Sequence, residues 1–128
     1  MDLVTPLGFR DILPAEARER EAIAREVAEL FNSRGYMPIE TPTLEVLDVM
    51  QMGARGVLSP FKFFDSRGDL LAMRPDVTVQ IARMVATRFA HADEPIKLRY
   101  QQRVLRETET QMQAAAREQT QVGLELLG

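Results

Sequence analysis

The residues whose types and spacing could bind a ligand are densest in Met73–Thr78, which reads MRPDVT. Asp76 and Thr78 supply a carboxylate and a hydroxyl where a strand is expected to lead into a helix, beside backbone N–H groups that the first helical turn leaves unpaired. Aspartate is also a preferred helix N-cap. Spacing therefore leaves two interpretations of Asp76 open, a binding residue or only a cap.

Arg106 is a second candidate, because it closes the expected strand from Ile96 to Leu105 and precedes a polar stretch, 107–116, that suits a mobile loop. A guanidinium at a strand end can hold a carboxylate or phosphate through two parallel hydrogen bonds. The alternative is an exposed arginine that pairs with Glu107 or Glu109, an arrangement that is common and nearly neutral in energy.

The last strand carries a third candidate group, in which polar and apolar residues alternate: Gln121, Gly123 and Glu125 against Val122, Leu124 and Leu126. If the apolar set faces the core, the polar set faces a wetter space, and the glycine removes bulk where a ligand could approach. The alternative is a half-solvated strand with a bulge glycine. The three groups together offer two carboxylates, an amide, a hydroxyl and a guanidinium, which suit a zwitterionic amino acid.

Composition limits the other chemistries. The 128 residues fit one folded domain, and the net charge of −3, from 16 basic and 19 acidic residues, makes nucleic acid an unexpected partner. With no cysteine and one histidine, His91, we expect no disulfide, metal site or cofactor, and no P-loop, dinucleotide or zincin motif occurs. The arginines interleave with acidic residues as a solvated face does: 83, 88, 99, 103 and 106.

Targeting signals are also missing from the sequence. The first residues, MDLVTPLGFRDILP, do not resemble a secretory signal, and no apolar run approaches the ~18 residues that a membrane span needs. We therefore expect a cytoplasmic protein.

The elements that must position these residues follow from hydrophobic periodicity. It predicts helices over 15–33, 44–52 and 77–89, a short edge strand over 36–41, a hairpin over 61–73, and strands over 96–104 and 120–127. Helices mixed with antiparallel strands, without βαβ regularity, indicate an α+β fold. Because the sequence stops directly after a strand, we expect 1–128 to be the N-terminal portion of a longer domain.

Five segments, read in order, resemble the start of the catalytic core of the histidyl-tRNA synthetase family: PLGFRDILPAEA, GYMPIETPTLE, FKFFDSRGDLLAMRPDVTVQIAR, LRYQQRVLR and REQTQVGLELLG. The resemblance covers nearly the whole chain and implies a class II synthetase-like antiparallel sheet flanked by helices. Pro42 resembles the motif 1 proline, which implies a homodimer interface, and Arg106 resembles the motif 2 arginine.

Two branches of that family differ in the motif 2 loop. True synthetases carry a glutamate and a Gly-Arg step there for ATP, whereas the matching places here read Arg106-Glu107-Thr108 and Ala114-Ala115-Ala116. Because methyl groups cannot hold triphosphate oxygens by charge, adenylate formation is expected to be impaired. RPDVTVQIAR resembles the non-catalytic regulatory branch. That likeness implies assembly with the short-form ATP phosphoribosyltransferase catalytic subunit in the first step of histidine biosynthesis, with feedback inhibition by histidine.

Carried over by this resemblance, Asp76, Thr78 and Gln121 would face the ammonium of histidine, Arg106 its carboxylate and Glu125 its imidazole. Two alternatives stay open. One is part of a true histidyl-tRNA synthetase that activates histidine with ATP, and the other is a module that only dimerises or senses histidine.

Overall fold

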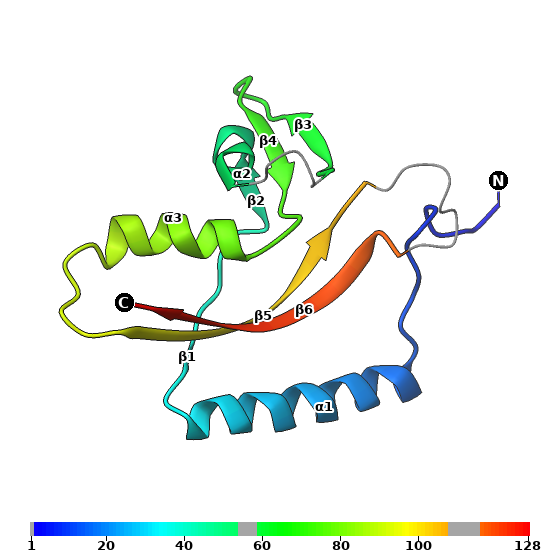
Figure 1. The fold of residues 1–128 in the computed structure, drawn as a ribbon. Coiled ribbons are helices and arrows are strands. Elements are labelled where there is room, and N and C mark those ends of the chain that lie inside the picture. The colour runs from blue at the N-terminus through cyan, green and yellow to red at the C-terminus, as the bar shows by residue number, and fades with distance from the viewer. Residues whose placement is uncertain (1, 54–58, 108–115) are drawn as a thin grey trace.

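The computed structural model describes residues 2–53, 59–107 and 116–128 (Figure 1). A long antiparallel hairpin, β5–β6, lies between helix α1 on one side and helix α3 on the other, and a smaller sheet with helix α2 lies beside α3. The elements are, in chain order, α1 Pro14–Ser33, β1 Met37–Pro38, β2 Leu44–Val46, α2 Leu47–Gly53, β3 Lys62–Phe64, β4 Leu70–Met73, α3 Thr78–Arg88, β5 Ile96–Leu105 and β6 Glu118–Leu127.

The main sheet has the strand order β1-β5-β6. Strands β5 and β6 pair antiparallel without interruption from Ile96 opposite Leu127 to Leu105 opposite Glu118, and β1 pairs parallel with β5. The predicted edge strand is confirmed, although it is short, and Pro38 lies in it, as expected of a residue that cannot donate to a ladder. Strand β6 begins two residues before the predicted start.

The smaller sheet has the order β2-β4-β3 and is antiparallel throughout the described residues. The predicted 61–73 hairpin is confirmed, with Gly68 at φ +86° in its turn. The predicted helix over 44–52 is wrong in its first three residues, because Leu44 to Val46 pair with β4 as a strand. Pairing with a distant strand overrides the local helical pattern there.

The hydrophobic core lies between α3 and β5. Its buried members are Val77, Ile81, Leu98, Tyr100 and Val104. The predicted apolar face of α3 is confirmed for Ile81, Met84 and Val85, which pack in or against this cluster, whereas Phe89 caps the helix and stays exposed. The core therefore fixes the start of α3 over the middle of the hairpin.

The opposite face of the hairpin is less covered. Helix α1 forms as predicted, but none of its residues is buried, and Ile23 and Leu30 are 61% and 54% exposed. Three apolar residues of β6 are exposed on the same face of the hairpin: Val122, Leu124 and Leu126. Leu124 and Leu126 pair across the strands with Arg99 and Lys97 of β5, whose side chains contact the end of α1. Of the two arrangements left open by the sequence, the one in which these three residues face the core does not occur: the polar alternates Gln121 and Glu125 face the start of α3 instead.

A surface cluster of charges fixes the start of α1. The Arg10 guanidinium donates two hydrogen bonds to Glu16, and Arg20 reaches the same carboxylate at 3.2 Å. The hydrogen bond from Arg10, followed by the smaller charge effects of Arg10 and Arg20, lowers the pKa of Glu16 from 4.5 to about 2. Because the folded pKa is depressed, this contribution to stability is present above pH 4.5 and is lost as the pH falls toward 2.

We predict that Arg10→Gln returns the pKa of Glu16 toward 4.5, because the largest cause of the shift is removed. Side-chain carbon shifts followed by NMR between pH 1.5 and 6 measure this pKa. Arg25→Gln, on the same helix but outside the cluster, is the control and should leave it unchanged. Only a small stability change is expected, since exposed ion pairs are screened by water. A wild-type Glu16 that titrates near 4.5 contradicts the prediction.

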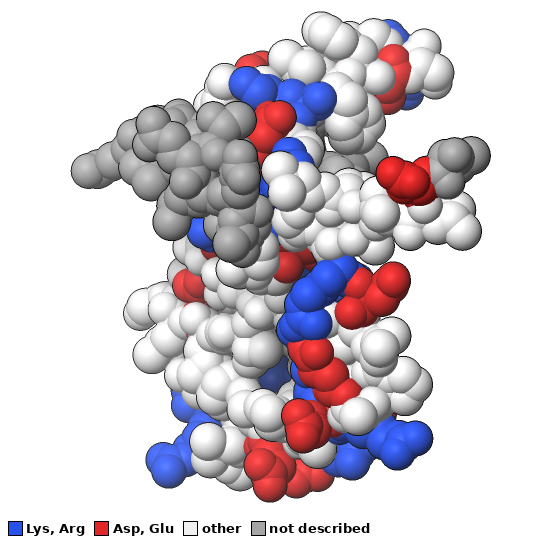
Figure 2. Space-filling model, turned by 90° about the vertical axis from the view of Figure 1, so that its right-hand side faces the viewer, with Lys and Arg blue, Asp and Glu red and all other residues white. Residues whose placement is uncertain are grey.

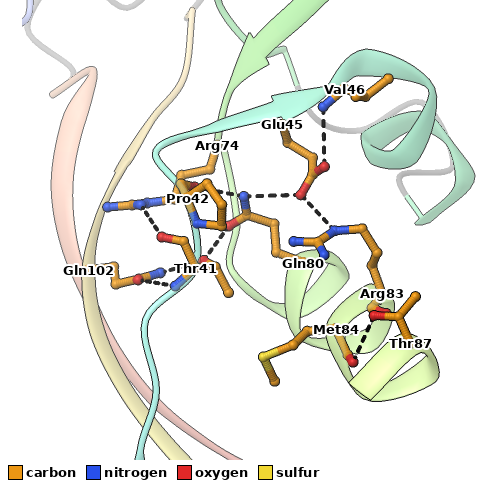
Figure 3. Close-up of polar contacts among 10 residues, drawn as sticks. All are labelled: Thr41, Pro42, Glu45, Val46, Arg74, Gln80, Arg83, Met84, Thr87 and Gln102. Carbon is orange, nitrogen blue, oxygen red and sulfur yellow. Dashed lines mark hydrogen bonds and ion pairs between the residues drawn. The ribbon is translucent and has the colours of Figure 1, made fainter. Parts of the chain in front are cut away.

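A buried polar network links the segment after β1 to α3 and β5 (Figure 3). The Thr41 amide donates to Gln102 Oε1 at 2.6 Å, and the Thr41 hydroxyl donates to Gln80 Oε1, also at 2.6 Å. Gln80 Nε2 donates to the Pro42 carbonyl at 2.8 Å and approaches Glu45, which forms a 3.0 Å ion pair with Arg83. The network holds the Thr41–Glu45 segment against α3 while leaving Pro42 on the surface.

Arg74 ties the start of the 74–77 turn to the end of β5. Its side chain donates to the carbonyls of Arg103, at 2.6 Å, and Thr41, at 3.1 Å, while the Leu105 amide donates to the Arg74 carbonyl. Burial lowers the pKa of Arg74. These bonds place Asp76, two residues further along, beside the hairpin.

Candidate functional site

The site begins where the 74–77 turn meets β6. The Asp76 carboxylate accepts hydrogen bonds through Oδ1 from the Val77 amide, at 2.8 Å, and from Gln121 Nε2, at 3.2 Å. Val77 occupies the N-cap position of α3, without a side-chain cap bond. The cap interpretation of Asp76 is therefore wrong, and its carboxylate contacts β6 instead.

Thr78, in the first turn of α3, faces the other polar residue of β6. Its hydroxyl donates to Glu125 Oε1 at 3.1 Å. Thr78 is exposed, whereas Asp76, Gln121 and Glu125 are half-buried. The structure thus joins four of the five residues predicted from the sequence in two neighbouring pairs, Asp76 with Gln121 and Thr78 with Glu125, and we call these four residues the acceptor cluster.

Arg106, the fifth predicted residue, lies at the edge of this cluster. Its Nε donates to the Pro75 carbonyl at 2.9 Å, which places the guanidinium beside the residue that precedes Asp76. Among the described ion pairs none joins Arg106 to Glu107, and Glu109 lies outside the described residues. The remaining guanidinium nitrogens can hold an anion there.

The acceptor cluster offers more acceptors than the chain fills. Gln121 Nε2 donates one hydrogen bond to Asp76, while the buried Oε1 of the same side chain has no partner within the described part of the chain. A buried acceptor without a partner costs ~1–3 kcal/mol. With the Asp76 carboxylate beside it, the complementary ligand group is a hydrogen-donating cation such as an ammonium.

The space over Gly123 is already occupied, which corrects two expectations about the last strand. Gly123 pairs in register with Tyr100, so it is not a bulge glycine. A Cβ on Gly123 would lie 2.3 Å from the Tyr100 hydroxyl and 2.5 Å from Cζ, so the tyrosine ring, not a ligand, fills that space.

Tyr100 is a residue of this region that the two-residue period of β5 does not single out, because it shares a face with the core residues Leu98 and Val104. The side chain is 6% exposed, and its ring and hydroxyl lie over Gly123 of β6. Burial raises the pKa of the Tyr100 phenol, and the charges of Glu125 and Asp76 add to this rise. The sequence shows a tyrosine in one expected strand and a glycine in the other, but only the structure shows that the two residues pair.

Three of the five arginines that interleave with acidic residues have polar partners within the described residues. Arg83 pairs with Glu45, Arg103 with Glu118, and Arg99 donates to Asn32, so these arginines are individually partnered. On the face shown in Figure 2, basic and acidic side chains of the described residues lie side by side. Such mixing gives no extended attraction for phosphates on that face. No helix in the described ranges is long and apolar enough to cross a membrane.

An antiparallel hairpin that ends in Arg106, with α3 packed on one face and the Thr41–Glu45 segment beside it, defines a class II aminoacyl-tRNA synthetase-like core of the α+β class. The model of the family described as histidyl-tRNA synthetase matches residues 8–128, and the chain belongs to that family. The fold predicted from the five segments is thereby confirmed.

Three relatives place the chain within the family. It is 41% identical, over 99% of its length, to the ATP phosphoribosyltransferase regulatory subunit of Syntrophotalea carbinolica. A Bacillus halodurans structure described as ATP phosphoribosyltransferase regulatory subunit/histidyl-tRNA synthetase superposes with a TM-score of 0.86 at 36% identity over 97% of the chain. A histidine--tRNA ligase subunit from Alicyclobacillus acidocaldarius gives 0.83 at 33% identity over all of it.

The match is partial on the relatives' side. The chain spans 30% of the Syntrophotalea carbinolica protein, 32% of the Bacillus halodurans chain and 36% of the Alicyclobacillus acidocaldarius chain. The resemblance to the regulatory-subunit branch is confirmed, since the curated relative carries that name over nearly the whole of this chain.

Proposed function

We propose that the chain supplies part of a histidine-binding site in a cytoplasmic, non-catalytic regulatory subunit of ATP phosphoribosyltransferase. The observation that carries the proposal is the acceptor cluster with its unfilled Gln121 Oε1. The ammonium of histidine donates to Asp76, Gln121 and Thr78, and Arg106 holds the carboxylate. Glu125, at the far end of the cluster, accepts from the imidazole.

The regulatory role is supported by the names of the relatives and by the sequence of the motif 2 loop. The similar proteins from Syntrophotalea carbinolica and Moorella thermoacetica are named as regulatory subunits. Three alanines, Ala114 to Ala116, stand where a synthetase carries residues for ATP. A subunit that cannot bind triphosphate acts on its partner, the short-form catalytic subunit, by binding histidine unequally in two states of the assembly.

Dimerisation through the Pro42 segment is part of the proposal. Pro42 is exposed, and the buried network behind it fixes the backbone from Thr41 to Glu45. A rigid, exposed segment loses little conformational entropy on association, which favours its use in an isologous contact between two copies.

The deciding experiment mixes the full-length gene product that contains this chain with a short-form ATP phosphoribosyltransferase catalytic subunit. We expect activity to rise on mixing and to fall when histidine is added, while either subunit alone stays inactive. Absence of activation removes the proposal. Heat-treated regulatory protein is the control for non-specific effects.

The second candidate is a histidyl-tRNA synthetase, which the likeness to the Alicyclobacillus acidocaldarius ligase subunit favours. It predicts histidine-dependent exchange of pyrophosphate into ATP by the same full-length protein. The regulatory proposal predicts none, because residues 107–116 include no basic residue to hold the triphosphate. Exchange above background therefore establishes the synthetase and excludes the regulatory subunit.

A further inference from the structure

We propose that Arg117 is a positioning residue for Arg106. Its side chain holds the N-terminal segment Thr5–Phe9 and Phe61 against the end of the β5–β6 hairpin, and we call this set of contacts the clamp. The clamp keeps the Arg106 guanidinium in place for an anionic group of the ligand. That this group is the carboxylate of histidine rests on the proposed function, whereas the clamp rests on contacts among described residues.

Arg106 lies just beyond the paired part of the hairpin. It follows Leu105, the last residue of β5 that pairs with β6, and strand ends open more readily than strand centres. Its amide donates to the Arg117 carbonyl at 2.9 Å. The next amide, that of Glu107, donates to the Ser59 carbonyl at 2.7 Å. The orientation of the Arg106 guanidinium therefore depends on how firmly these two backbone acceptors are held.

Arg117 is bonded to the N-terminal segment, which lies beside the start of β6, through both its backbone and its side chain (Figure 1). Its amide donates to the Gly8 carbonyl at 2.9 Å, and its Nη1 donates to the Leu7 carbonyl at 3.0 Å. Gly8 has a φ of +83° in a tight turn in which the Phe9 amide donates to the Pro6 carbonyl. A Cβ on Gly8 would overlap Cγ and Cδ of Arg117, so the arginine stem fills the space that a side chain would need.

The Arg117 guanidinium lies over two aromatic rings. Its central carbon is 4.6 Å from the ring centre of Phe61 and 5.7 Å from that of Phe9, and such cation–π contacts are attractive. Phe61 comes two residues after Ser59, so the guanidinium also steadies the segment that accepts from the Glu107 amide. One arginine thus supports both backbone acceptors at the end of β5.

An unpaired donor on Arg117 lets positioning be separated from stability. Its Nε is buried and has no hydrogen-bond partner within the described part of the chain. Such a donor destabilises a fold. Arg117→Met keeps an apolar stem over Gly8 and removes the unpaired donor together with the guanidinium contacts, so its effects on stability oppose each other. The variant is expected to unfold at nearly the wild-type urea concentration while Arg106 loses its fixed orientation.

The test measures binding of histidine, and of histamine, which lacks the carboxylate, by calorimetry in the full-length gene product. Arg117→Met should weaken histidine binding about tenfold and leave histamine binding nearly unchanged, because only the carboxylate contacts Arg106. Arg103→Met is the matched control, since it removes an exposed arginine of β5 that pairs with Glu118, and should change neither ligand. Equal weakening of both ligands by Arg117→Met, or histidine binding as in wild type, overturns the proposal.

Two glycines of positive φ test the clamp from the N-terminal segment. Gly8 and Gly68 have φ of +83° and +86°, so replacement by alanine strains the backbone similarly at both positions. Only Gly8→Ala would also displace Arg117, because nothing lies within 4 Å of the Cβ position at Gly68. Gly8→Ala should therefore weaken histidine binding, as Arg117→Met does, and Gly68→Ala should not. Equal histidine binding by the two glycine variants contradicts the clamp.

Hydrogen exchange of the Arg106 amide, followed by NMR without ligand, separates failure of the clamp from failure of the proposed function. In wild type this amide should exchange slowly, because it donates to the Arg117 carbonyl. Gly8→Ala should speed its exchange about tenfold, since the strand end then opens more often, and Gly68→Ala should not. If that pattern holds but the protein binds no histidine, the proposed ligand is wrong and the clamp stands. An Arg106 amide that exchanges equally fast in wild type and both variants overturns the clamp, whatever histidine does.

Discussion

Replacing Gln80 with leucine is expected to destabilise the protein by ~2–4 kcal/mol, because buried groups lose their partners without gaining water. Gln80 is fully buried, and its amide satisfies the Thr41 hydroxyl and the Pro42 carbonyl at 2.6 and 2.8 Å. Leucine fills a similar volume, so a packing defect contributes little. The lost stability therefore measures the contribution of the buried polar network. The substitution also frees the segment that carries Pro42 from its contact with α3.

Urea unfolding of wild type and variant gives this free energy. Gln101→Leu is the matched control, since it makes the same chemical change at an exposed position on β5 and should alter stability by no more than ~0.5 kcal/mol. If the two variants unfold at the same urea concentration, the network makes no such contribution. Light scattering of the Gln80→Leu protein also tests dimerisation, which should weaken when the Pro42 segment loosens.

The sequence predicts the elements whose patterns are local. The 3.6-residue period of α3 and the two-residue period of β5 each indicate the element and the face it buries, since one apolar side must meet the core. The Gly68 hairpin is likewise encoded in its own turn residues. Strand β2 is not, because Leu44 to Val46 become a strand only through pairing with β4.

Alternation alone does not say which face of β6 is covered. Both faces of the strand satisfy a two-residue period, and the choice depends on the elements that lie on each side. Here α3 brings Asp76 and Thr78 over Gln121 and Glu125, so the polar face is the more enclosed one.

Buried polar residues are the hardest part to predict. Glutamines are usually exposed, so Gln80 and Gln102 gave no sign of burial. Their partner Thr41 is 39 and 61 residues away in sequence, a separation that no local pattern records. Tyr100 is hard to single out for a related reason, because its ring fits the apolar core while its hydroxyl lies over Gly123 on the polar face of β6.

Neutralising the two carboxylates of the acceptor cluster should weaken histidine binding without lowering the stability of the fold. We expect Asp76→Asn and Glu125→Gln each to weaken histidine binding by about 100-fold, since an ammonium or imidazole donor loses a charged acceptor worth ~2–5 kcal/mol. Stability should be unchanged or slightly higher. Neither carboxylate has a basic partner among the described ion pairs, and the amides keep the oxygens that accept from Val77 and Thr78.

Binding by calorimetry and unfolding by urea, both in the full-length gene product, check the two halves of this expectation. Glu118→Gln is the matched control, because it neutralises another carboxylate of β6 that pairs with Arg103 outside the cluster. It should bind histidine as wild type does. Variants at 76 and 125 that lose binding only because they unfold contradict the argument, as do stable variants that bind normally. If neutralising these carboxylates leaves the free energy of unfolding unchanged but weakens histidine binding, their charges serve the ligand and not the fold.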